Sequence, residues 1–306
     1  MSDDPVGAAV YRGPHGHARR SGPNRPAVPR ERAPELASPA MHLCAARTAA
    51  SRRAFLGLLG VGAAAVLTGL AGCAGAEPPG PPPPPPLPPV PEPRPGPSRL
   101  MERGPADTGQ RIALTVDDGT CVDCVAGYVE FARRTGTHLT FSPNGVLDGA
   151  WRPQAKALAP LIATGQVQMI NHTWSHPRLS TLPEAKIREE IERNDEWVVK
   201  VFGVTTRPYC RPPFGERDAT VDAIAGSLGY TRSVQWSGSY NDSGPGTPEA
   251  LMEQARKIFR PGGIVLGHAN QPTVLGLFDE LLALLRERRL EAVTLDEMFG
   301  TSRAVG

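Results

Sequence analysis

Short apolar runs alternate with longer helical patterns from residue 111 almost to the end of the chain, and this alternation limits the fold more than any other feature. Seven runs have the length and character of β-strands: 111–116, 138–142, 166–171, 207–210, 231–236, 263–267 and 291–295. Strands that alternate with helices favour a parallel sheet, either open or closed into a barrel. Seven such units fit a short (β/α) barrel best, so we expect an α/β fold of this kind in a single domain over residues 105–306.

The clearest helix pattern covers residues 182–202, where apolar residues recur at helical spacing between charged ones. Thr181 and Glu184 have the spacing of a capping box at its start. Thr247 followed by Pro248 predicts the beginning of another helix, and residues 277–285 begin the last long one.

The first 73 residues have the layout of an extension followed by an export signal. Residues 1–50 show no periodic apolar pattern, which predicts a disordered segment. Residues 51–73 place paired arginines before an uncharged run that ends in LAGC, and they resemble a twin-arginine signal with a lipobox. The resemblance implies cleavage before Cys73 and a lipid on its sulfur. A retained N-terminal anchor helix is the alternative, and either interpretation places the rest of the chain outside the cytoplasm, anchored to the membrane.

A proline-rich linker, residues 74–104, separates this signal from the predicted domain. Within it, residues 77–98 are dominated by proline and should form polyproline II rather than helix or sheet. About 22 residues at about 3.1 Å each would span on the order of 70 Å. We interpret the segment as a stiff spacer, with a proline-rich docking ligand as the less favoured alternative.

The polar residues that could carry chemistry gather at the C-terminal ends of the predicted strands. In chain order they are Asp117 and Asp118, His172, Arg211, Trp236, Asp242 and His268. Barrels and open α/β sheets both build their active sites at this edge. We therefore expect these side chains to share one site.

His172 and His176 are four residues apart, and with one aspartate they make a three-ligand metal site that leaves a position open. The same ligands also serve non-haem iron oxygenases, so the neighbours must decide. Asp117 and Asp118 should point to opposite sides of an extended backbone, so that one binds metal while the other remains a free base.

Two further residues favour hydrolysis over oxygen chemistry. Arg211 could pair with the free carboxylate and hold it ionised, and His268 could supply the acid for a leaving group. A metal, a base, an acid and an orienting arginine together predict metal-assisted hydrolysis.

Four short motifs in this order resemble those of the polysaccharide deacetylases, the NodB-homology family of carbohydrate esterases: TVDDG (115–119), HTWSH (172–176), RPPFG (211–215) and LGH (266–268). The resemblance covers about residues 111–298. It implies a distorted seven-stranded (β/α) barrel that removes acetyl groups from N-acetylated sugars.

The resemblance also implies a role for each matching residue. Asp117 corresponds to the general base, His268 to the general acid and Arg211 to the arginine that tethers the base. Metal ligands would be Asp118, His172 and His176, with zinc as the usual metal and cobalt or manganese as alternatives. Substrate-side positions would be the Phe214 amide as oxyanion donor and Leu266 as a wall of the acetyl pocket. Trp236, at the end of its predicted strand, is a further candidate for the substrate side on its position alone.

This chain departs from the family pattern in two places. Val116 and Thr120 stand where Phe and Pro are usual, so the first loop should be reshaped. The segment SYNDS (239–243) replaces two aspartates and a tryptophan, and leaves Asp242 to orient His268.

Three cysteines follow Cys73. We expect Cys121 and Cys124 to form a local disulfide that braces the reshaped loop, with a thioredoxin-type redox motif as the alternative. Cys210 should point away from the site because it precedes Arg211 on an extended strand. His138 begins a strand, at the wrong end for catalysis, and should be structural.

These features favour an extracytoplasmic, metal-dependent N-deacetylase acting on a cell-envelope glycan, with peptidoglycan preferred because the spacer would reach into a wall. Alternatives on the same scaffold are a deacetylase or esterase for another glycan and a small-amide hydrolase. From other classes come a non-catalytic carbohydrate-binding lipoprotein and a redox lipoprotein. With 33 basic and 31 acidic residues and no basic stripe, we expect no nucleic-acid partner, and the sequence indicates no protein partner.

Overall fold

The computed structural model describes residue 92 and residues 94–300, all within the unit Ala76–Gly306. The predicted disordered extension, the signal and Cys73 lie outside the described residues. Nine strands are found in the described part: β1 Arg99–Met101, β2 Arg111–Asp118, β3 Leu139–Pro143, β4 Val167–Met169, β5 Tyr209–Cys210, β6 Arg232–Val234, β7 Gly238–Ser239, β8 Ile264–His268 and β9 Glu291–Val293.

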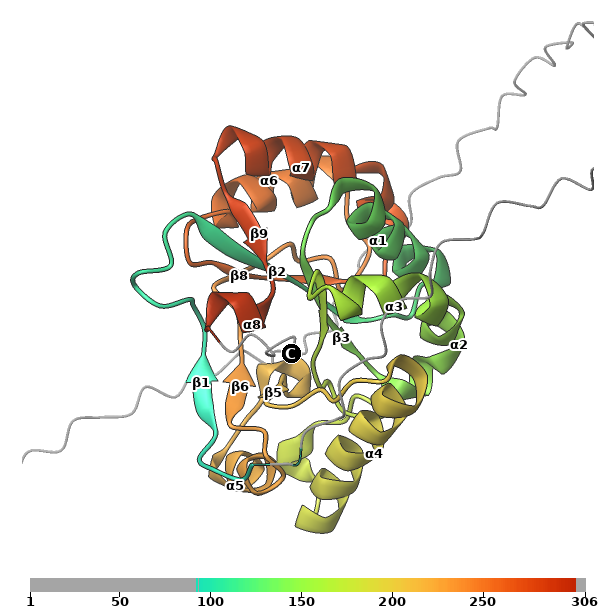
Figure 1. Ribbon diagram of the computed structural model, residues 1–306, viewed down its shortest axis with the longest axis vertical. Helices are drawn as coiled ribbons and strands as arrows, with labels where there is room; N and C mark the ends of the chain where they lie inside the picture. The colour runs from blue at the N-terminus through green and yellow to red at the C-terminus, as the bar shows by residue number, and fades with distance from the viewer. Residues whose placement is uncertain (1–91, 93, 301–306) are drawn as a thin grey trace, which may run out of the picture. The chain divides into compact units, whose positions relative to one another are not determined.

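Helices lie between most of these strands, as the alternation predicts (Figure 1). They are α1 Val122–Thr135, α2 Asp148–Trp151, α3 Ala155–Ala163, α4 Glu184–Phe202, α5 Ala219–Ser227, α6 Pro248–Ile258, α7 Phe278–Glu287 and α8 Leu295–Met298. Short 3-10 turns cover Gly145–Leu147, Arg152–Gln154, Leu179–Thr181, Pro213–Gly215 and Pro272–Gly276. None of the helices in the described residues has the length and apolar character that a membrane crossing requires.

The paired strands are all parallel, which confirms the α/β class, but they form two sheets rather than one continuous wall. The larger sheet has the order β4-β3-β2-β8-β7, with β9 also paired to β2, and the smaller has the order β1-β6-β5. An isolated parallel bridge between Asn171 and Cys210 joins the two across the β4–β5 gap. The barrel is therefore distorted, with nine short strands where seven are predicted.

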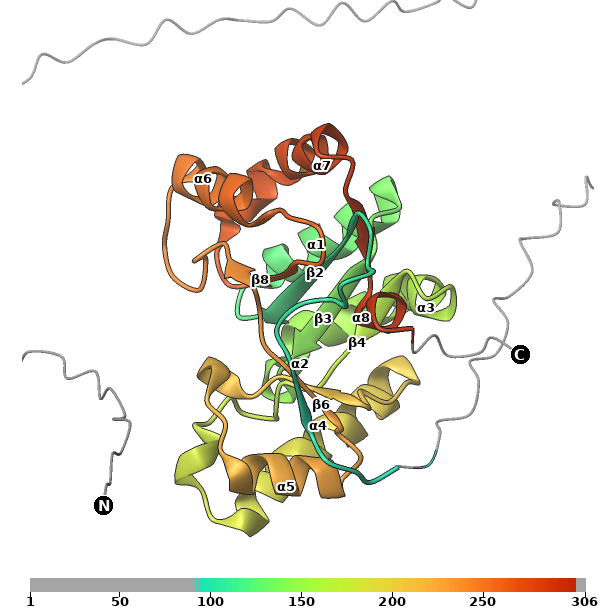
Figure 2. The same cartoon turned by 90° about the vertical axis from the view of Figure 1, so that its left-hand side faces the viewer.

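Separate groups of helices cover the two sheets. Figure 2 shows α6 and α7 at one end of the molecule and α4 and α5 at the other. Apolar residues of α1, α3, α6 and α7 pack with the outward residues of β2, whereas α4 and α5 enclose Cys210 of β5. Cys210 thus points away from the barrel interior, as expected.

Alternation along β2 sets the polarity of the barrel interior. Leu114 and Val116 face the helices, whereas Ala113 faces an inner cluster that includes Tyr209 and Ile264. Thr115 and Asp117 share the inner face of β2 with Ala113 because side chains alternate along a strand. The interior is therefore apolar at its base and polar at the C-terminal ends of the strands.

The last residues of the predicted linker belong to the folded unit. Arg99 to Met101 of β1 pair in parallel with β6, and Gly96 N–H donates to Gly226 O at 3.1 Å. A Cβ on Gly226 would lie 2.3 Å from Gly96 O, so this close approach needs glycine there. The linker assigned to 74–104 is therefore too long at its C-terminal end, because backbone pairing holds a segment that has no apolar period.

The capping box predicted at the start of α4 is wrong. Pro183 occupies the N-cap position, and the Thr181 hydroxyl donates to Arg178 O at 2.8 Å within the preceding 3-10 turn. Thr247, in contrast, caps α6 as expected, since its side chain accepts from Ala250 N–H. His138 lies at the opposite end of β3 from the polar rim, where its Nδ1 is 2.8 Å from Glu297 Oε2.

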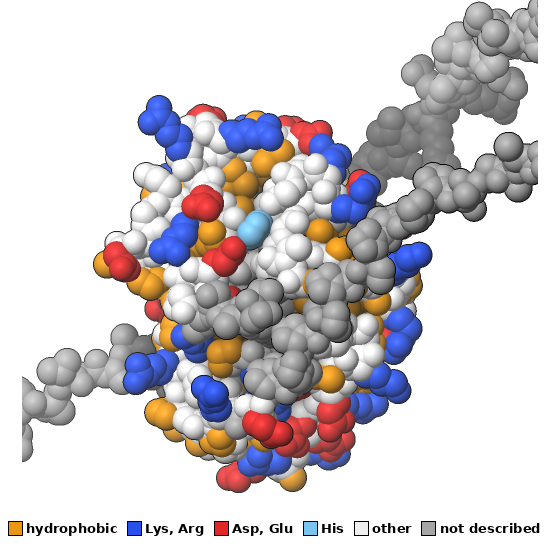
Figure 3. All heavy atoms as spheres, in the orientation of Figure 1, with side chains coloured by type: hydrophobic (Ala, Val, Ile, Leu, Met, Phe, Trp, Pro, Cys, Tyr) orange, Lys and Arg blue, Asp and Glu red, His pale blue; other side chains and the backbone are white. Residues whose placement is uncertain are grey.

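The face drawn in Figure 3 carries both basic and acidic side chains, with several basic ones along its right-hand side and acidic ones near the bottom.

Candidate active site

Asp117 and Asp118, the last residues of β2, bring their carboxylates to the same place. Asp117 Oδ2 is 3.5 Å and Asp118 Oδ1 is 3.4 Å from His172 Nε2. The expectation that they point to opposite sides is wrong, because Asp118 has φ +68° and its backbone is no longer extended. Trp151 Nε1 donates to Asp118 O at 2.7 Å and stabilises this left-handed conformation.

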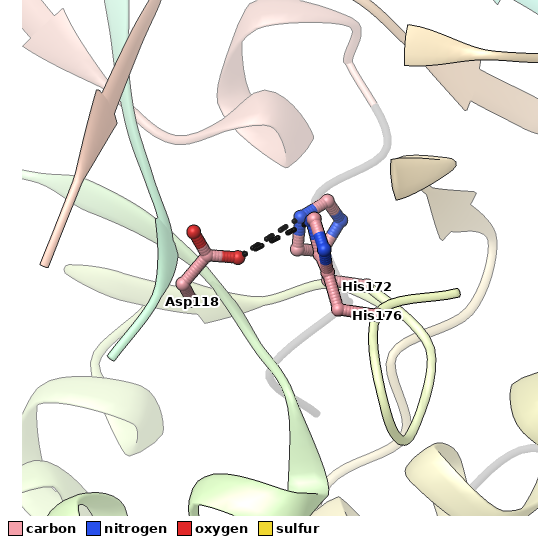
Figure 4. Close-up of side chains that lie close together, drawn as sticks. All are labelled: Asp118, His172 and His176. Carbon is pink, nitrogen blue, oxygen red and sulfur yellow. Dashed lines mark ion pairs between the residues drawn. The ribbon is translucent and has the colours of Figure 1, made fainter. Parts of the chain in front are cut away.

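The two histidines approach Asp118 from a separate loop after β4 (Figure 4). His176 Nε2 is 3.5 Å from Asp118 Oδ1, and the two imidazole centroids are 4.9 Å apart. Nδ1 of His172 bonds to the Arg211 carbonyl at 2.7 Å, which turns its Nε2 toward the carboxylates. One ligand atom from each of these three residues lies within 4.8 Å of the other two.

The chemistry of this triangle fits a cation. Asp118 Oδ1 is buried and has no hydrogen-bond partner in the described part of the chain, although it faces two imidazole nitrogens. A buried carboxylate oxygen without a partner is costly, and a divalent metal would satisfy it. Asp118, His172 and His176 are therefore the residues that could hold a metal.

Charge around the triangle favours ionised aspartate. Burial alone would raise the pKa of Asp118, but the nearby His172, with smaller contributions from His176 and Asn270, holds it well below its usual range. Burial and the neighbouring His172 lower the pKa of His176, which favours the neutral, metal-binding imidazole.

Arg211 is fully buried and pairs with Asp117. Its Nη1 donates to Asp117 Oδ1 at 2.7 Å and to Thr115 Oγ1 at 2.9 Å, and its Nη2 donates to Gln235 O at 3.3 Å. Each partner of a buried ion pair compensates the charge of the other, so removing either one leaves an uncompensated buried charge. The contact fixes one carboxylate oxygen of Asp117 and leaves the other 3.5 Å from His172 Nε2.

His268 ends β8 directly beside Asp117 in register and is held by Asp242. Its Nδ1 is 2.8 Å from Asp242 Oδ1, and its backbone N–H donates to Asp242 Oδ2 at 3.1 Å. Burial by itself would lower the pKa of His268, but Asp242 and the more distant Asp117 and Asp118 outweigh it and raise the pKa. A protonated imidazole on this rim can donate a proton.

The remaining predicted residues line the surroundings of this centre. The Phe214 ring is 53% exposed and lies 4.6 Å from the His176 ring, with the Arg178 guanidinium 4.5 Å above it. Trp236 is half-buried, with its ring 5.9 Å from the Arg211 guanidinium. Leu266 is buried and alternates with the helix-facing Val265, so it shares the inner face of β8 with His268.

The cysteines fall outside the metal triangle. Cys121 and Cys124 form a disulfide, and the Cys121 sulfur accepts from Cys124 N–H at the start of α1. Cys210 is free and buried, and burial raises its pKa to about 12. An inert thiol fits its place among the α4 and α5 side chains.

Several supporting residues escaped the sequence analysis. Asn144 Nδ2 donates to His172 O at 2.6 Å, and its place just after the second predicted strand could have pointed to it. Glu190 accepts from Ser175 N–H at 2.8 Å and Ser175 Oγ at 2.7 Å, which braces the loop between the histidines. Nothing in the charged face of α4 distinguishes Glu190 in the sequence. Asn270, two residues after His268, bonds to Asp118 and is likewise unmarked.

Residues 105–233 match the family model of polysaccharide deacetylases, a stretch that includes Asp117 and Phe214 but ends before Asp242 and His268. The chain is similar to the peptidoglycan-N-acetylglucosamine deacetylase PgdA of Listeria monocytogenes, with 27% identity over 69% of this chain and 44% of the relative. The chain thus spans less than half the length of this curated relative.

Solved structures share the fold. One is the Bc1960 peptidoglycan N-acetylglucosamine deacetylase, with a TM-score of 0.60, 24% identity and coverage of 66% of this chain and 94% of that one. Another is BA3943, a CE4-family pseudoenzyme from Bacillus anthracis, with a TM-score of 0.57, 18% identity and coverage of 65% and 68%. The match to the polysaccharide deacetylase model is thus confined to residues 105–233, and the solved structures share the α/β fold of this chain.

Proposed function

We propose that the protein is an extracytoplasmic, metal-dependent hydrolase that removes N-acetyl groups from a cell-envelope polysaccharide, with peptidoglycan as the favoured substrate. The observation that carries the proposal is the meeting of three units on one rim: the Asp118, His172 and His176 triangle, the Asp117–Arg211 pair, and the His268–Asp242 pair. The name of the Listeria relative favours peptidoglycan N-acetylglucosamine as the substrate.

The metal would be held by Asp118, His172 and His176, and zinc is proposed, with cobalt or manganese as alternatives. Two imidazoles and one carboxylate suit such ions and leave coordination positions open. When bound, a metal of this kind polarises the acetamide carbonyl and lowers the pKa of water.

The chain's own residues would move the protons. Asp117, held by Arg211, is placed to accept a proton from the attacking water, and His268 to donate one to the departing nitrogen. That donation matters because an amide anion is a very poor leaving group. The Phe214 backbone amide would donate to the developing oxyanion, while Leu266 would bound the acetyl methyl group and Trp236 the sugar.

We further propose that the domain is tethered outside the cytoplasm by a lipid on Cys73 and held away from the membrane by the proline-rich stretch. The support is the sequence alone: paired arginines, an uncharged run and LAGC precede that stretch.

Replacing Asp242 with asparagine should move the alkaline limb of the kcat/KM pH profile to lower pH. Asp242 contributes to the raised pKa of His268, and a neutral side chain would remove that contribution. The general acid must be protonated, so a lower pKa means that activity is lost at lower pH as the pH rises. If the alkaline limb lies at the same pH in the variant and the wild type, His268 is not a general acid whose pKa Asp242 raises.

Substrate range separates the proposal from its alternatives on the same scaffold. Acetate release should be measured from peptidoglycan, chitin oligosaccharides, acetylated xylan and a small acetamide under the same conditions. Preference for peptidoglycan supports the proposal. Faster release from acetylated xylan would make the protein an O-acetyl esterase, and release only from the small acetamide would make it a small-amide hydrolase.

Cysteine variants distinguish a structural disulfide between Cys121 and Cys124 from a redox function of these residues. If the disulfide only braces the loop after β2, the double change Cys121→Ser and Cys124→Ser should lower the free energy of unfolding by about 2 kcal/mol and leave most of the deacetylase activity. Unfolding in denaturant and acetate release test both parts. Loss of activity in the folded double variant, together with resistance of the wild type to chelator, would favour the redox function.

A further inference from the structure

A hydrogen-bonded network centred on Asn270 connects the metal-site aspartate to the loop that follows β2. Asn270 Nδ2 donates to Asp118 Oδ2 at 2.7 Å. Its Oδ1 accepts from the Thr120 hydroxyl at 2.8 Å and from Thr120 N–H at 3.1 Å, and lies 3.4 Å from Gly119 N. One amide side chain therefore contacts both a metal-site oxygen and the loop beside it.

Backbone hydrogen bonds hold the segment that contains Asn270 at a fixed distance from Asp118. Ala269 N–H donates to Asp117 O at 3.0 Å, and Cys121 N–H donates to Ala269 O at 3.1 Å. The segment after β8 is thus held to the chain on both sides of Asp118. A short side chain at position 270 can meet Asp118 without further rearrangement.

The two ends of the Asn270 amide are not interchangeable. Its oxygen faces hydroxyl and N–H donors, and its nitrogen faces a carboxylate. Rotating the amide by half a turn would place oxygen against a carboxylate and nitrogen against N–H groups, which is unfavourable at both ends. The Asp118 carboxylate and the Thr120 backbone N–H therefore fix which way the Asn270 amide points, and the Thr120 hydroxyl adds a further bond to its oxygen.

The same network separates the roles of the two Asp118 oxygens. Oδ2 is engaged by Asn270, whereas Oδ1 is buried without a partner and faces His172 Nε2 and His176 Nε2 at 3.4 and 3.5 Å. A carboxylate fixed in this way presents one oxygen to a metal and cannot rotate freely about its last bond. Hydrogen bonds to a ligand's second atom commonly set ligand orientation and metal affinity.

We infer that Asn270 is a positioning residue that orients the Asp118 carboxylate for metal binding, and that Thr120 acts through it by fixing the amide. The inference rests on the metal site proposed above. It gives a function to Thr120, which stands where the family motif usually has proline: a proline there would have neither the hydroxyl nor the N–H that Asn270 accepts.

The test is the zinc dissociation constant of the full chain, measured by competition with a chromophoric chelator and without any substrate. Asn270→Ala should bind zinc about 10- to 100-fold more weakly than the wild type. Thr120→Val, which keeps the backbone N–H but loses the hydroxyl, should show a smaller loss, and Thr120→Ser should restore wild-type affinity. Gln271→Ala is the matched control, because this neighbouring amide side chain makes no capping bond to the 3-10 turn it precedes.

The outcomes separate this inference from the proposed function. Wild-type zinc affinity in a folded Asn270→Ala variant would overturn the positioning role while leaving the metal site intact. An equal loss of zinc affinity in Gln271→Ala would also overturn it, since a general change in the loop would then explain the weaker binding. If Asn270→Ala does not unfold cooperatively, the zinc affinities of Thr120→Val and Thr120→Ser are compared in its place. Equal zinc affinities for these two variants would refute the inference. A wild type that binds no zinc would refute both the inference and the metal site.

Discussion

Replacing Asp117 with asparagine should lower kcat for acetate release by about 10³-fold while zinc binding stays close to that of the wild type. The amide keeps an oxygen for Arg211 Nη1, so the buried guanidinium retains a partner, but it cannot accept the proton of the attacking water. Zinc content and kcat measured on the same preparation test the two halves of this expectation.

Asp279→Asn provides the matched control for Asp117. Asp279 is an exposed aspartate of α7 that pairs with Arg134 at the surface, so its change should leave kcat unaltered. An Asp117→Asn enzyme with near wild-type kcat would show that another group acts as the base.

His172→Ala should abolish metal binding and activity together. The variant loses one of three ligands and opens a space beside two buried carboxylates, so its zinc affinity should fall on the order of 10³-fold or more. Chelator competition and acetate release give the two readouts.

His138→Ala is the control for this change, because His138 is a partly exposed histidine bonded to Glu297 at the far end of β3. It should retain metal and activity. Equal zinc affinity in His172→Ala and the wild type would remove His172 from the metal site.

The edge of the sheet that carries the site could be predicted from sequence. Residues that directly follow parallel strands lie at the C-terminal edge of the sheet. Asp117, His172, Arg211 and His268 all lie at that edge, as strand position implies. The convergence of Asp117 and Asp118 could not be predicted, since it depends on φ +68° at Asp118 and on Trp151, which is remote in sequence. Backbone conformation at a single residue reversed an inference that holds for extended chain.

Two short strands show another limit of periodicity. β1 has three residues beside a proline-rich segment, and β7 has two, Gly238 and Ser239. Neither is long enough to show a period of two, and their pairing depends on backbone groups from distant strands. The division of the barrel into two sheets follows from such short elements.

The fold does not decide the activity of this chain. BA3943, a pseudoenzyme, has a similar fold, so the barrel alone does not show that this chain is an enzyme. Here the residues proposed as base and acid are each paired with another side chain beside the Asp118, His172 and His176 triangle. A carbohydrate-binding protein would not require this combination, and it therefore favours catalysis.

The most direct test of the central claim is acetate release from purified peptidoglycan by the full chain, before chelator, after chelator, and after zinc is returned. We predict that release stops on chelation and resumes with zinc. Continued release without metal, or no release from peptidoglycan by a zinc-loaded protein, would contradict a metal-dependent peptidoglycan deacetylase.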